Sequence, residues 1–199
     1  MIHAVTDDRV LALPDFLARA RALALGPGFA IHLRGTLDGG RLLDLADELR
    51  RLTAPSATRL VIHDRLDVAR MAGADGAHLP AAGVPSAAAR ALLGPEPLLG
   101  RSTHTADEAR AAGAADVDYV FLGNIWETAT HPGRPPLGVT ALAAALPSSR
   151  PPVIAIGGIT PDRAGQARAA GATGVAAVRA LWDAPDPALA MRALLLSFR

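Results

Sequence analysis

Five histidines stand at positions suited to acid–base chemistry. Four of them lie in or just after short apolar runs typical of strands, and the fifth lies in a long irregular segment. The carboxyl ends of parallel strands meet at one edge of a sheet, and imidazole exchanges protons near neutral pH. Each could instead be a surface or structurally hydrogen-bonded histidine, but for the set we predict at least one functional member. The five are His32, His63, His78, His104 and His131, whereas His3 stands near the start of the first run.

Other charged and hydroxyl groups follow two of the same apolar runs. Asp64 comes directly after the third run and precedes Arg65. A carboxylate in that place can bind Mg²⁺, act as a base or pair with the neighbouring arginine. Arg101 and Ser102 follow the fifth run, and together they suit a phosphate or carboxylate group.

A glycine pair, Gly157 and Gly158, follows the seventh apolar run and precedes a helix start marked by Thr160. Glycines at a strand exit let a ligand approach the backbone and leave N–H groups free to bind an anion. The eighth run also leads into a helix start, and adjacent strand exits of this kind form phosphate sites in barrels. A plain strand–turn–helix without a ligand is the alternative. The candidate phosphate-binding residues are Gly157, Gly158, Val178 and Arg179.

The longest irregular segment covers residues 123–138 and reads GNIWETATHPGRPPLG. Long loops in compact domains commonly form lids or binding loops, and the hydroxyl, carboxylate, imidazole and guanidinium groups here favour that interpretation. An ordinary surface loop is the alternative. The candidate site residues in this segment are Asn124, Thr128, Thr130 and His131.

The composition excludes several classes of chemistry. The 199 residues include no cysteine, so disulfides and thiolate nucleophiles are excluded, and no lysine, so no side chain can form a Schiff base. A net charge of +1 and 4% aromatic residues argue against nucleic-acid binding. We see no signal peptide and no apolar stretch that could span a membrane, so we expect a soluble cytoplasmic protein.

Short apolar runs alternate with longer stretches of helical period along the whole chain. Several runs are continuously apolar, as expected where both faces of a parallel sheet are buried. Eight such units predict a single (β/α)8 TIM-barrel domain over residues 1–199, with a doubly wound open sheet as the alternative. The expected strands are Ile2–Val5, Phe29–Leu33, Arg59–His63, Gly76–Leu79, Leu98–Arg101, Tyr119–Leu122, Val153–Ile156 and Gly174–Ala177.

Five stretches, in this order and at this spacing, resemble the thiamine phosphate synthase/TenI superfamily. The resemblance implies a TIM barrel that binds a thiazole phosphate. It also implies one of two activities. The synthase joins an aminopyrimidine pyrophosphate to thiazole phosphate with Mg²⁺, whereas TenI-type tautomerases aromatise a thiazole carboxylate phosphate by proton transfer without a metal. The stretches are residues 3–8, 75–80, 100–104, 118–128 and 152–161.

The chain departs from the synthase pattern at several charged positions. Losing one of two carboxylates weakens a Mg²⁺ site, and losing both lysines removes charge that a pyrophosphate leaving group needs. Arg34 and Asp64 match the pattern. The positions that differ are His32, Gly35 and Thr36 in place of Gln, Glu and Lys, Gly83 in place of the second Asp, and His131 in place of the loop Lys.

The tautomerase pattern fits better, at residues 78–80, 100–102 and 126–128. One departure is that Asn124 stands where that type has its proton-carrying histidine, and an amide is no base. The resemblance implies phosphate contacts in the loop, at the glycine pair and at the eighth strand exit, with Arg34 or Arg101 on the carboxylate. The candidate proton carriers are His104, His131, His63 and His32; the implied phosphate contacts are Thr128, Thr130, Gly157, Gly158, Val178 and Arg179.

We therefore expect a TenI-like thiazole tautomerase with no cofactor. A divergent thiamine phosphate synthase is the first alternative, and only there do we expect Mg²⁺, at Asp64. A non-catalytic protein that binds thiazole phosphate is the second alternative, which Asn124 favours. In each case the expected partner is a small-molecule thiazole phosphate, with neither nucleic acid nor membrane, and the expected assembly is a homodimer.

Overall fold

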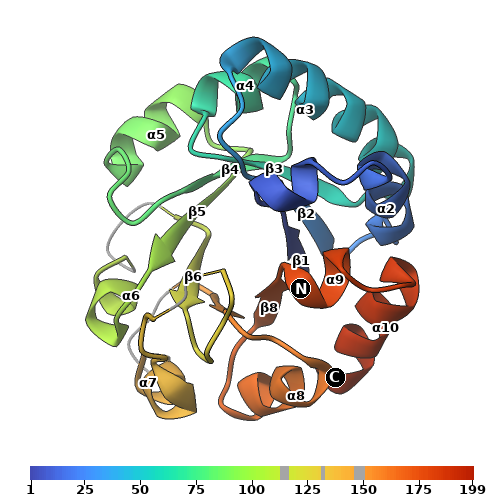
Figure 1. Ribbon diagram of the computed structural model, residues 1–199. Helices are drawn as coiled ribbons and strands as arrows, with labels where there is room; N and C mark the ends of the chain where they lie inside the picture. The colour runs from blue at the N-terminus through green and yellow to red at the C-terminus, as the bar shows by residue number, and fades with distance from the viewer. Residues whose placement is uncertain (113–116, 131–132, 146–150) are drawn as a thin grey trace.

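The computed structural model describes residues 1–112, 117–130, 133–145 and 151–199. Eight parallel strands form a closed barrel in chain order, with β8 paired to β1 (Figure 1). The predicted (β/α)8 barrel is confirmed, and the open-sheet alternative is wrong because closure leaves no edge. The strands are β1 (Ile2–Val5), β2 (Phe29–Leu33), β3 (Arg59–His63), β4 (Gly76–Leu79), β5 (Leu98–Thr103), β6 (Tyr119–Gly123), β7 (Val153–Ile156) and β8 (Gly174–Ala177).

Two strands run further than the sequence predicts. β5 continues to Thr103, because Ser102 pairs with Phe121 and Thr103 with Leu122 on β6. β6 continues to Gly123, because Gly123 pairs with Ile156 on β7. Polar side chains therefore stand inside the ladder at the carboxyl end of β5. This extension places Ser102 on the barrel wall rather than on a free loop.

The helices form a ring around the barrel (Figure 1). Two short helices, α1 and α9, follow β1 and β8 directly and lie at the carboxyl ends of the strands. The four-residue α1 is absent from the sequence prediction. The helices are α1 (Asp8–Leu11), α2 (Phe16–Leu23), α3 (Gly39–Thr53), α4 (Leu66–Met71), α5 (Ser86–Leu93), α6 (Ala106–Ala112), α7 (Gly138–Ala145), α8 (Pro161–Ala169), α9 (Arg179–Trp182) and α10 (Pro187–Ser197), with a 3₁₀ turn η1 (Ala54–Ser56).

The helix starts follow from local chemistry. Thr160 caps α8 as predicted, since its hydroxyl accepts from the Arg163 N–H at 3.3 Å and Pro161 takes the first helical position. Asp7 caps α1 in the same way, accepting from the Val10 N–H at 2.9 Å. No helix among the described residues is long and apolar enough to cross a bilayer.

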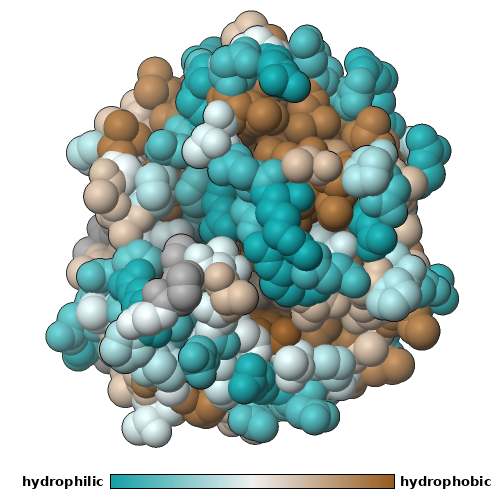
Figure 2. Space-filling model, in the orientation of Figure 1, coloured by the Kyte–Doolittle hydropathy of each residue, from teal (hydrophilic) through white to brown (hydrophobic). Residues whose placement is uncertain are grey.

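The face of the barrel that carries α1 and α9 is polar at its centre. Figure 2 shows a band of hydrophilic side chains there, over these two helices, flanked by more apolar surface. In a barrel of this type the carboxyl ends of the strands carry the active site. The polar centre of this face is therefore the expected location of the site.

Candidate active site

A pocket opens at the carboxyl ends of the strands, mainly along β5 to β8. It spans about 740 Å³, part of it open to solvent. Ten of the residues predicted from the sequence to form the site line it, and further lining residues come from the same strand ends. The ten are Arg34, Ser102, His104, Asn124, Thr128, Thr130, Gly157, Gly158, Val178 and Arg179.

The glycine pair shapes the pocket floor. Gly157 and Gly158 have φ of 97° and 65°, a region that side chains rarely adopt. A Cβ on Gly157 would stand 2.5 Å from the Asn124 Cβ, and one on Gly158 would stand 2.5 Å from the Glu127 carbonyl oxygen. The loop after β6 therefore packs directly on the glycines, and its path depends on their missing side chains.

Backbone donors gather beside these glycines. α9 begins at Val178 without a side-chain cap, so its first-turn N–H groups stay available. Among the described residues, the Gly158 N–H also has no acceptor. Val178, Arg179 and the glycine pair line the same pocket. This arrangement is suited to an anion such as a phosphate.

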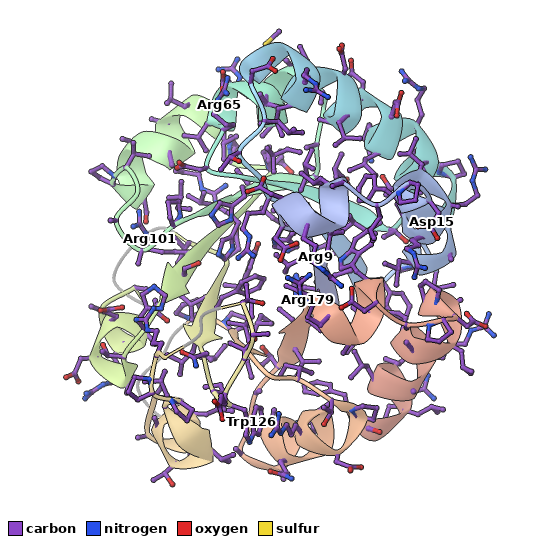
Figure 3. All side chains as sticks on the ribbon, viewed as in Figure 1. Arg9, Asp15, Arg65, Arg101, Trp126 and Arg179 are labelled. Atoms are coloured by element: carbon purple, nitrogen blue, oxygen red, sulfur yellow. The ribbon has the colours of Figure 1, made fainter. Side chains whose placement is uncertain are left out.

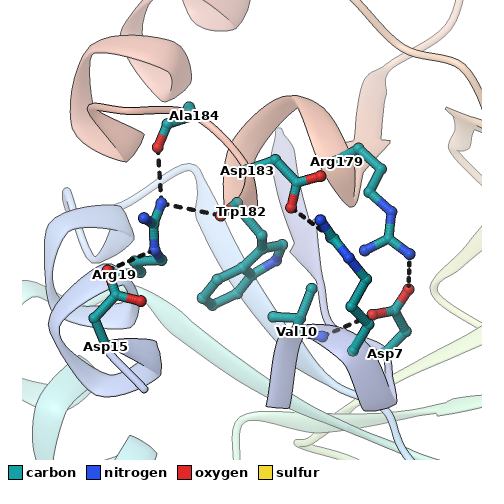
Figure 4. A network of polar contacts seen from close by, with 9 residues as sticks. Asp7, Val10, Asp15, Arg19, Arg179, Trp182, Asp183 and Ala184 are labelled. Carbon is teal, nitrogen blue, oxygen red and sulfur yellow. Dashed lines mark hydrogen bonds and ion pairs between the residues drawn. The ribbon is translucent and has the colours of Figure 1, made fainter. Parts of the chain in front are cut away.

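Arg179 joins this region to the opposite side of the mouth. Its Nη2 contacts the Asp7 carboxylate at 2.9 Å, while its buried Nη1 has no partner among the described residues. Asp7 also caps α1, and Arg9 on α1 pairs with Asp183 at 2.6 Å (Figure 4). Two ion pairs thus hold α1 against α9 beside the pocket, and Arg179 points toward the barrel centre (Figure 3).

Arg34 adds a second guanidinium to the pocket. Its Nε donates to the Thr6 carbonyl at 3.1 Å, which fixes the side chain at the end of β2. Burial lowers the pKa of Arg34, and the positive charge of Arg179 lowers it further, against the carboxylates of Asp7 and Asp8. Two cations that repel each other across one pocket favour a ligand with negative charge.

Within the described part of the chain, His104 is the imidazole that lines the pocket. Its Nδ1 lies 2.9 Å from the Gly123 carbonyl oxygen, and a carbonyl can only accept, so Nδ1 carries the proton. Its backbone N–H donates to Glu108 at 2.6 Å. In the neutral ring this tautomer leaves the lone pair on Nε2, which is the form required of a general base.

Asn124 is oriented by the loop around it. Its Nδ2 donates to the carbonyl oxygens of Trp126 at 3.3 Å and Arg134 at 3.4 Å. Its buried Oδ1 has no partner among the described residues. The amide is therefore fixed as an acceptor at the pocket wall, where it can accept a hydrogen bond but cannot move a proton.

Hydroxyl groups complete the polar lining. Ser102 lies on β5, and the Thr128 and Thr130 hydroxyls lie 3.5 Å apart in the loop after β6. The predicted site residue His131 lies outside the described residues. Thr103 and Phe121, which were not predicted from the sequence, also line the pocket, as does Arg134, the guanidinium of the predicted binding loop. Only the position of Thr103 and Phe121 next to predicted site residues could have indicated these two.

Three predicted site residues do not line the pocket. His63 stacks on His78 at 5.4 Å between ring centres, and burial, with the charge of Arg34, lowers the pKa of His63 to about 4. Asp64 is exposed, and its carboxylate has no partner among the described residues, because Arg65 pairs with Asp67 at 2.6 Å instead.

Arg101 is the third predicted site residue that does not line the pocket. Its guanidinium donates to the Ser86 hydroxyl at 3.1 Å, to the Ala81 carbonyl at 3.1 Å and to the Val84 carbonyl. It therefore holds the loop between β4 and α5 and points away from Arg179 (Figure 3). We expected Arg34 or Arg101 to meet a carboxylate, and the geometry places only Arg34 in the pocket.

The prediction that His32 and His78 stand at the mouth is wrong. Both are fully buried inside the barrel, as is His3 at 1% exposure. His3 Nδ1 lies 2.8 Å from His32 Nε2. Burial lowers the pKa of His3 to about 3 and lowers the pKa values of His32 and His78 well below the usual range, so all three stay neutral. The physical reason is that these histidines occupy inward positions of the strands.

No cluster of three or more His, Cys, Asp or Glu side chains that could hold a metal ion occurs among the described residues. A magnesium ion can nevertheless be held by one or two carboxylates together with substrate phosphates. Asp64, with its unpartnered carboxylate, is the residue that fits such a minimal site.

Comparison with known proteins gives a consistent result. The thiamine monophosphate synthase (TMP-TENI) family profile matches residues 2–181. A putative thiamine-phosphate synthase of Geobacter sulfurreducens is 39% identical, covering 98% of this chain and 92% of that protein. The thiamine-phosphate synthase of Moorella thermoacetica is 38% identical over 89% of this chain and 86% of its own length.

A solved structure agrees with these relatives. Thiamine phosphate pyrophosphorylase from Pyrococcus furiosus superposes with a TM-score of 0.85 at 25% identity, covering 99% of this chain and 94% of that one. The predicted superfamily is thereby confirmed. With its closed barrel, its pocket at the strand ends and these relatives, the chain belongs to the thiamine monophosphate synthase family, whose proteins act in thiamine biosynthesis.

Proposed function

We propose that this protein is a thiamine phosphate synthase, which joins an aminopyrimidine pyrophosphate to a thiazole phosphate. The relatives' names favour this transferase over the tautomerase that the sequence analysis ranked first. In the reaction, the thiazole nitrogen bonds to the methylene carbon of the pyrimidine. The bond from that carbon to the pyrophosphate oxygen breaks, and pyrophosphate leaves with the electron pair.

The observation that carries this proposal is the combination of two anion-binding regions in one pocket. The glycine pair and the uncapped start of α9 offer backbone N–H groups to a phosphate. Arg34 and the unpartnered Nη1 of Arg179 offer guanidinium donors beside them. A reaction between two phosphorylated substrates needs two such regions.

The charge on a pyrophosphate leaving group needs neutralising in the transition state. Asp64 would hold Mg²⁺ through its free carboxylate, with substrate phosphate oxygens completing the ligand set. When bound, Mg²⁺ supplies charge neutralisation for the leaving group. Arg34 would bind the same pyrophosphate, which compensates in part for the missing lysines.

A second candidate, the TenI-like tautomerase, is supported by His104. In the neutral ring its Nε2 carries the lone pair and the ring lines the pocket, so His104 can take a proton from a thiazole carbon and return it elsewhere on the thiazole ring. General acid–base catalysis of this kind contributes roughly 10²–10⁴-fold. Asn124 then accepts a hydrogen bond from the ligand rather than carrying the proton.

Two assays with the purified protein separate the candidates. The first supplies both synthase substrates and measures thiamine phosphate with Mg²⁺ and with excess chelator. We expect product only with Mg²⁺, loss of product in Asp64→Asn, and retention in the matched control Asp67→Asn. Product formation that is unchanged under chelation contradicts the proposal.

The second assay supplies the unaromatised thiazole carboxylate phosphate in chelator and follows aromatisation. Turnover that His104→Gln abolishes and Asp64→Asn leaves intact supports the tautomerase. Binding of thiazole phosphate by calorimetry with no turnover in either assay supports a non-catalytic binding protein instead. Light scattering on the same samples tests the expected homodimer.

A further inference from the structure

A chain of three polar side chains runs from the barrel interior to the pocket wall. The Tyr119 hydroxyl lies 3.2 Å from His78 Nδ1, and His78 Nε2 lies 2.9 Å from the Ser102 hydroxyl. His78 is 0% exposed and Tyr119 is 6% exposed, whereas Ser102 lines the pocket. Among the described residues, Ser102 is therefore the hydrogen-bonding link between these two interior residues and the pocket, although both rings also lie against Phe121.

The strand register builds this chain. On adjacent strands, His78 stands opposite Gly100, and Gly100 stands opposite Tyr119. A Cβ on Gly100 would collide with the Tyr119 ring, so the missing side chain makes room for the ring against β5. The Tyr119 hydroxyl can thus reach past β5 to His78 on β4.

The direction of each hydrogen bond follows from the burial of its ends. Among the described residues, His78 is the one polar side chain that the Tyr119 hydroxyl contacts. Burial raises the pKa of Tyr119, so its hydroxyl keeps its proton, and that proton needs an acceptor. Tyr119 therefore donates to His78 Nδ1, which must be unprotonated.

The directions of the remaining hydrogen bonds follow from this step. A neutral imidazole that accepts at Nδ1 carries its proton on Nε2. His78 then donates to the Ser102 oxygen, and the Ser102 proton is left to point into the pocket. The opposite direction would leave the Tyr119 proton buried without an acceptor.

We propose, building on the proposed function, that His78 and Tyr119 are positioning residues that fix Ser102 as a hydrogen-bond donor to the substrate. The group of the substrate that meets Ser102 is then an acceptor, such as a ring nitrogen or a phosphate oxygen. A ligand with an N–H or O–H at this point is disfavoured. The hydrogen bonds of Tyr119 and His78 thus select the ligand group that can meet Ser102, as well as holding the Ser102 hydroxyl in place.

The first test needs no substrate. Nitrogen-15 NMR of the histidine rings in the free protein reports which nitrogen of His78 is protonated. We expect Nε2–H in the native protein and a mixture of both forms in Tyr119→Phe, where the fixed donor is gone. A native His78 protonated at Nδ1 overturns the proposal, whether or not the enzyme has synthase activity.

The second test is a double-mutant cycle on synthase turnover. We expect Tyr119→Phe to lower kcat/KM about tenfold in the native background and to have no further effect in Ser102→Ala, because it acts through that hydroxyl. Equal losses in both backgrounds contradict the proposal and indicate general destabilisation. Thr58→Val serves as the control, since it removes another buried hydroxyl, hydrogen-bonded to Gly26 outside the pocket, and should leave turnover unchanged.

A native protein without activity in either assay contradicts the proposed function but not the hydrogen-bond series from Tyr119 through His78 to Ser102. In that case the NMR result stands alone, and the cycle is repeated with the affinity for thiazole phosphate. An unchanged affinity in Ser102→Ala would then show that Ser102 meets no ligand acceptor, which also overturns the inference.

Discussion

Two neighbouring regions of this barrel differ in whether backbone or side-chain groups supply their polar atoms. The phosphate cup, formed by Gly157, Gly158 and the start of α9, is made of backbone. The barrel interior beneath the mouth, with His3, His32 and other rings, is made of buried polar side chains. The cup depends on the shape of the chain, whereas the interior depends on the protonation and direction of each ring.

Because of this difference, the two regions are sensitive to different changes in sequence and pH. Side chains near the cup can vary while the N–H groups remain, so function there tolerates much substitution but not the gain of a Cβ. The interior holds neutral imidazoles whose unpartnered nitrogens include His3 Nε2 and His32 Nδ1. Such a region responds to pH and to the loss of one polar atom.

Gly157→Ala should give the largest effect, because it breaks the cup. The residue has φ 97°, and the new Cβ would stand 2.5 Å from the Asn124 Cβ, so strain and displacement of the loop combine. We expect phosphate affinity, measured by calorimetry, to fall about 100-fold, or roughly 2.7 kcal/mol.

Gly73→Ala is the matched control. It has a similar backbone, φ 58°, but open space around the new Cβ, and it lies outside the pocket. We expect it to lower stability modestly and to leave phosphate affinity unchanged. Similar affinities in both variants would mean that the cup does not depend on close packing of the β6 loop.

Acidification should act on the interior. The pKa of His3 is lowered to about 3 by burial, so between its unfolded value of 6.5 and about 3 the unfolded chain binds more protons than the native one. Stability is therefore lost as pH falls, by roughly 1.4 kcal/mol per pH unit for one such group. We expect urea unfolding at pH 5 to show about 2 kcal/mol less stability from His3 than at pH 7.

The variant His3→Gln separates this histidine from the others. It removes one titrating group, so its stability should depend less steeply on pH than that of the native protein. Because His32 and His78 are also held neutral, some dependence should remain. A native protein with equal stability at both pH values would show that the rings are solvated.

How far the sequence predicts these two regions also differs. Gly157, Gly158 and Thr160 are visible in the sequence, because glycine pairs and helix caps are local signals. The interior is not visible, because strands buried on both faces lose the alternation that would show which way His32 points. The contact between His3 and His32 joins residues 29 apart, and the pairing of β1 with β2 brings them together.

The short helix α1 and the different roles of Arg34 and Arg101 could not be predicted from local sequence either. The four-residue α1 is too short for a helical period, and what holds it is the Asp7 cap and the ion pair of Arg9 with Asp183. Arg101 and Arg34 follow strand ends alike, so the sequence could not say that one guanidinium binds a loop and the other enters the pocket.

Arg34→Gln should weaken the anion-binding side of the pocket by a smaller amount than the cup variant. The substitution removes one of the three guanidiniums that line the pocket while the backbone cup stays intact. We expect pyrophosphate affinity to fall about tenfold, or roughly 1.4 kcal/mol, with a smaller change for inorganic phosphate. Equal loss for both anions would place Arg34 at the cup instead.

Arg101→Gln should have the smallest effect on ligand affinity, and it pairs with Arg34→Gln as a matched substitution. The Arg101 guanidinium donates hydrogen bonds to Ser86, Ala81 and Val84, and these bonds fix the loop between β4 and α5. Losing these bonds should lower unfolding free energy by about 1 kcal/mol, measured in urea, because the carbonyls it leaves can meet water. Pyrophosphate affinity should not change. A tenfold loss of affinity, like that expected for Arg34→Gln, would instead mean that Arg101 leaves its loop partners to bind ligand. Arg101 would then join Arg34, Arg134 and Arg179 as a fourth guanidinium of the pocket, and the loop after β4 would be part of the site.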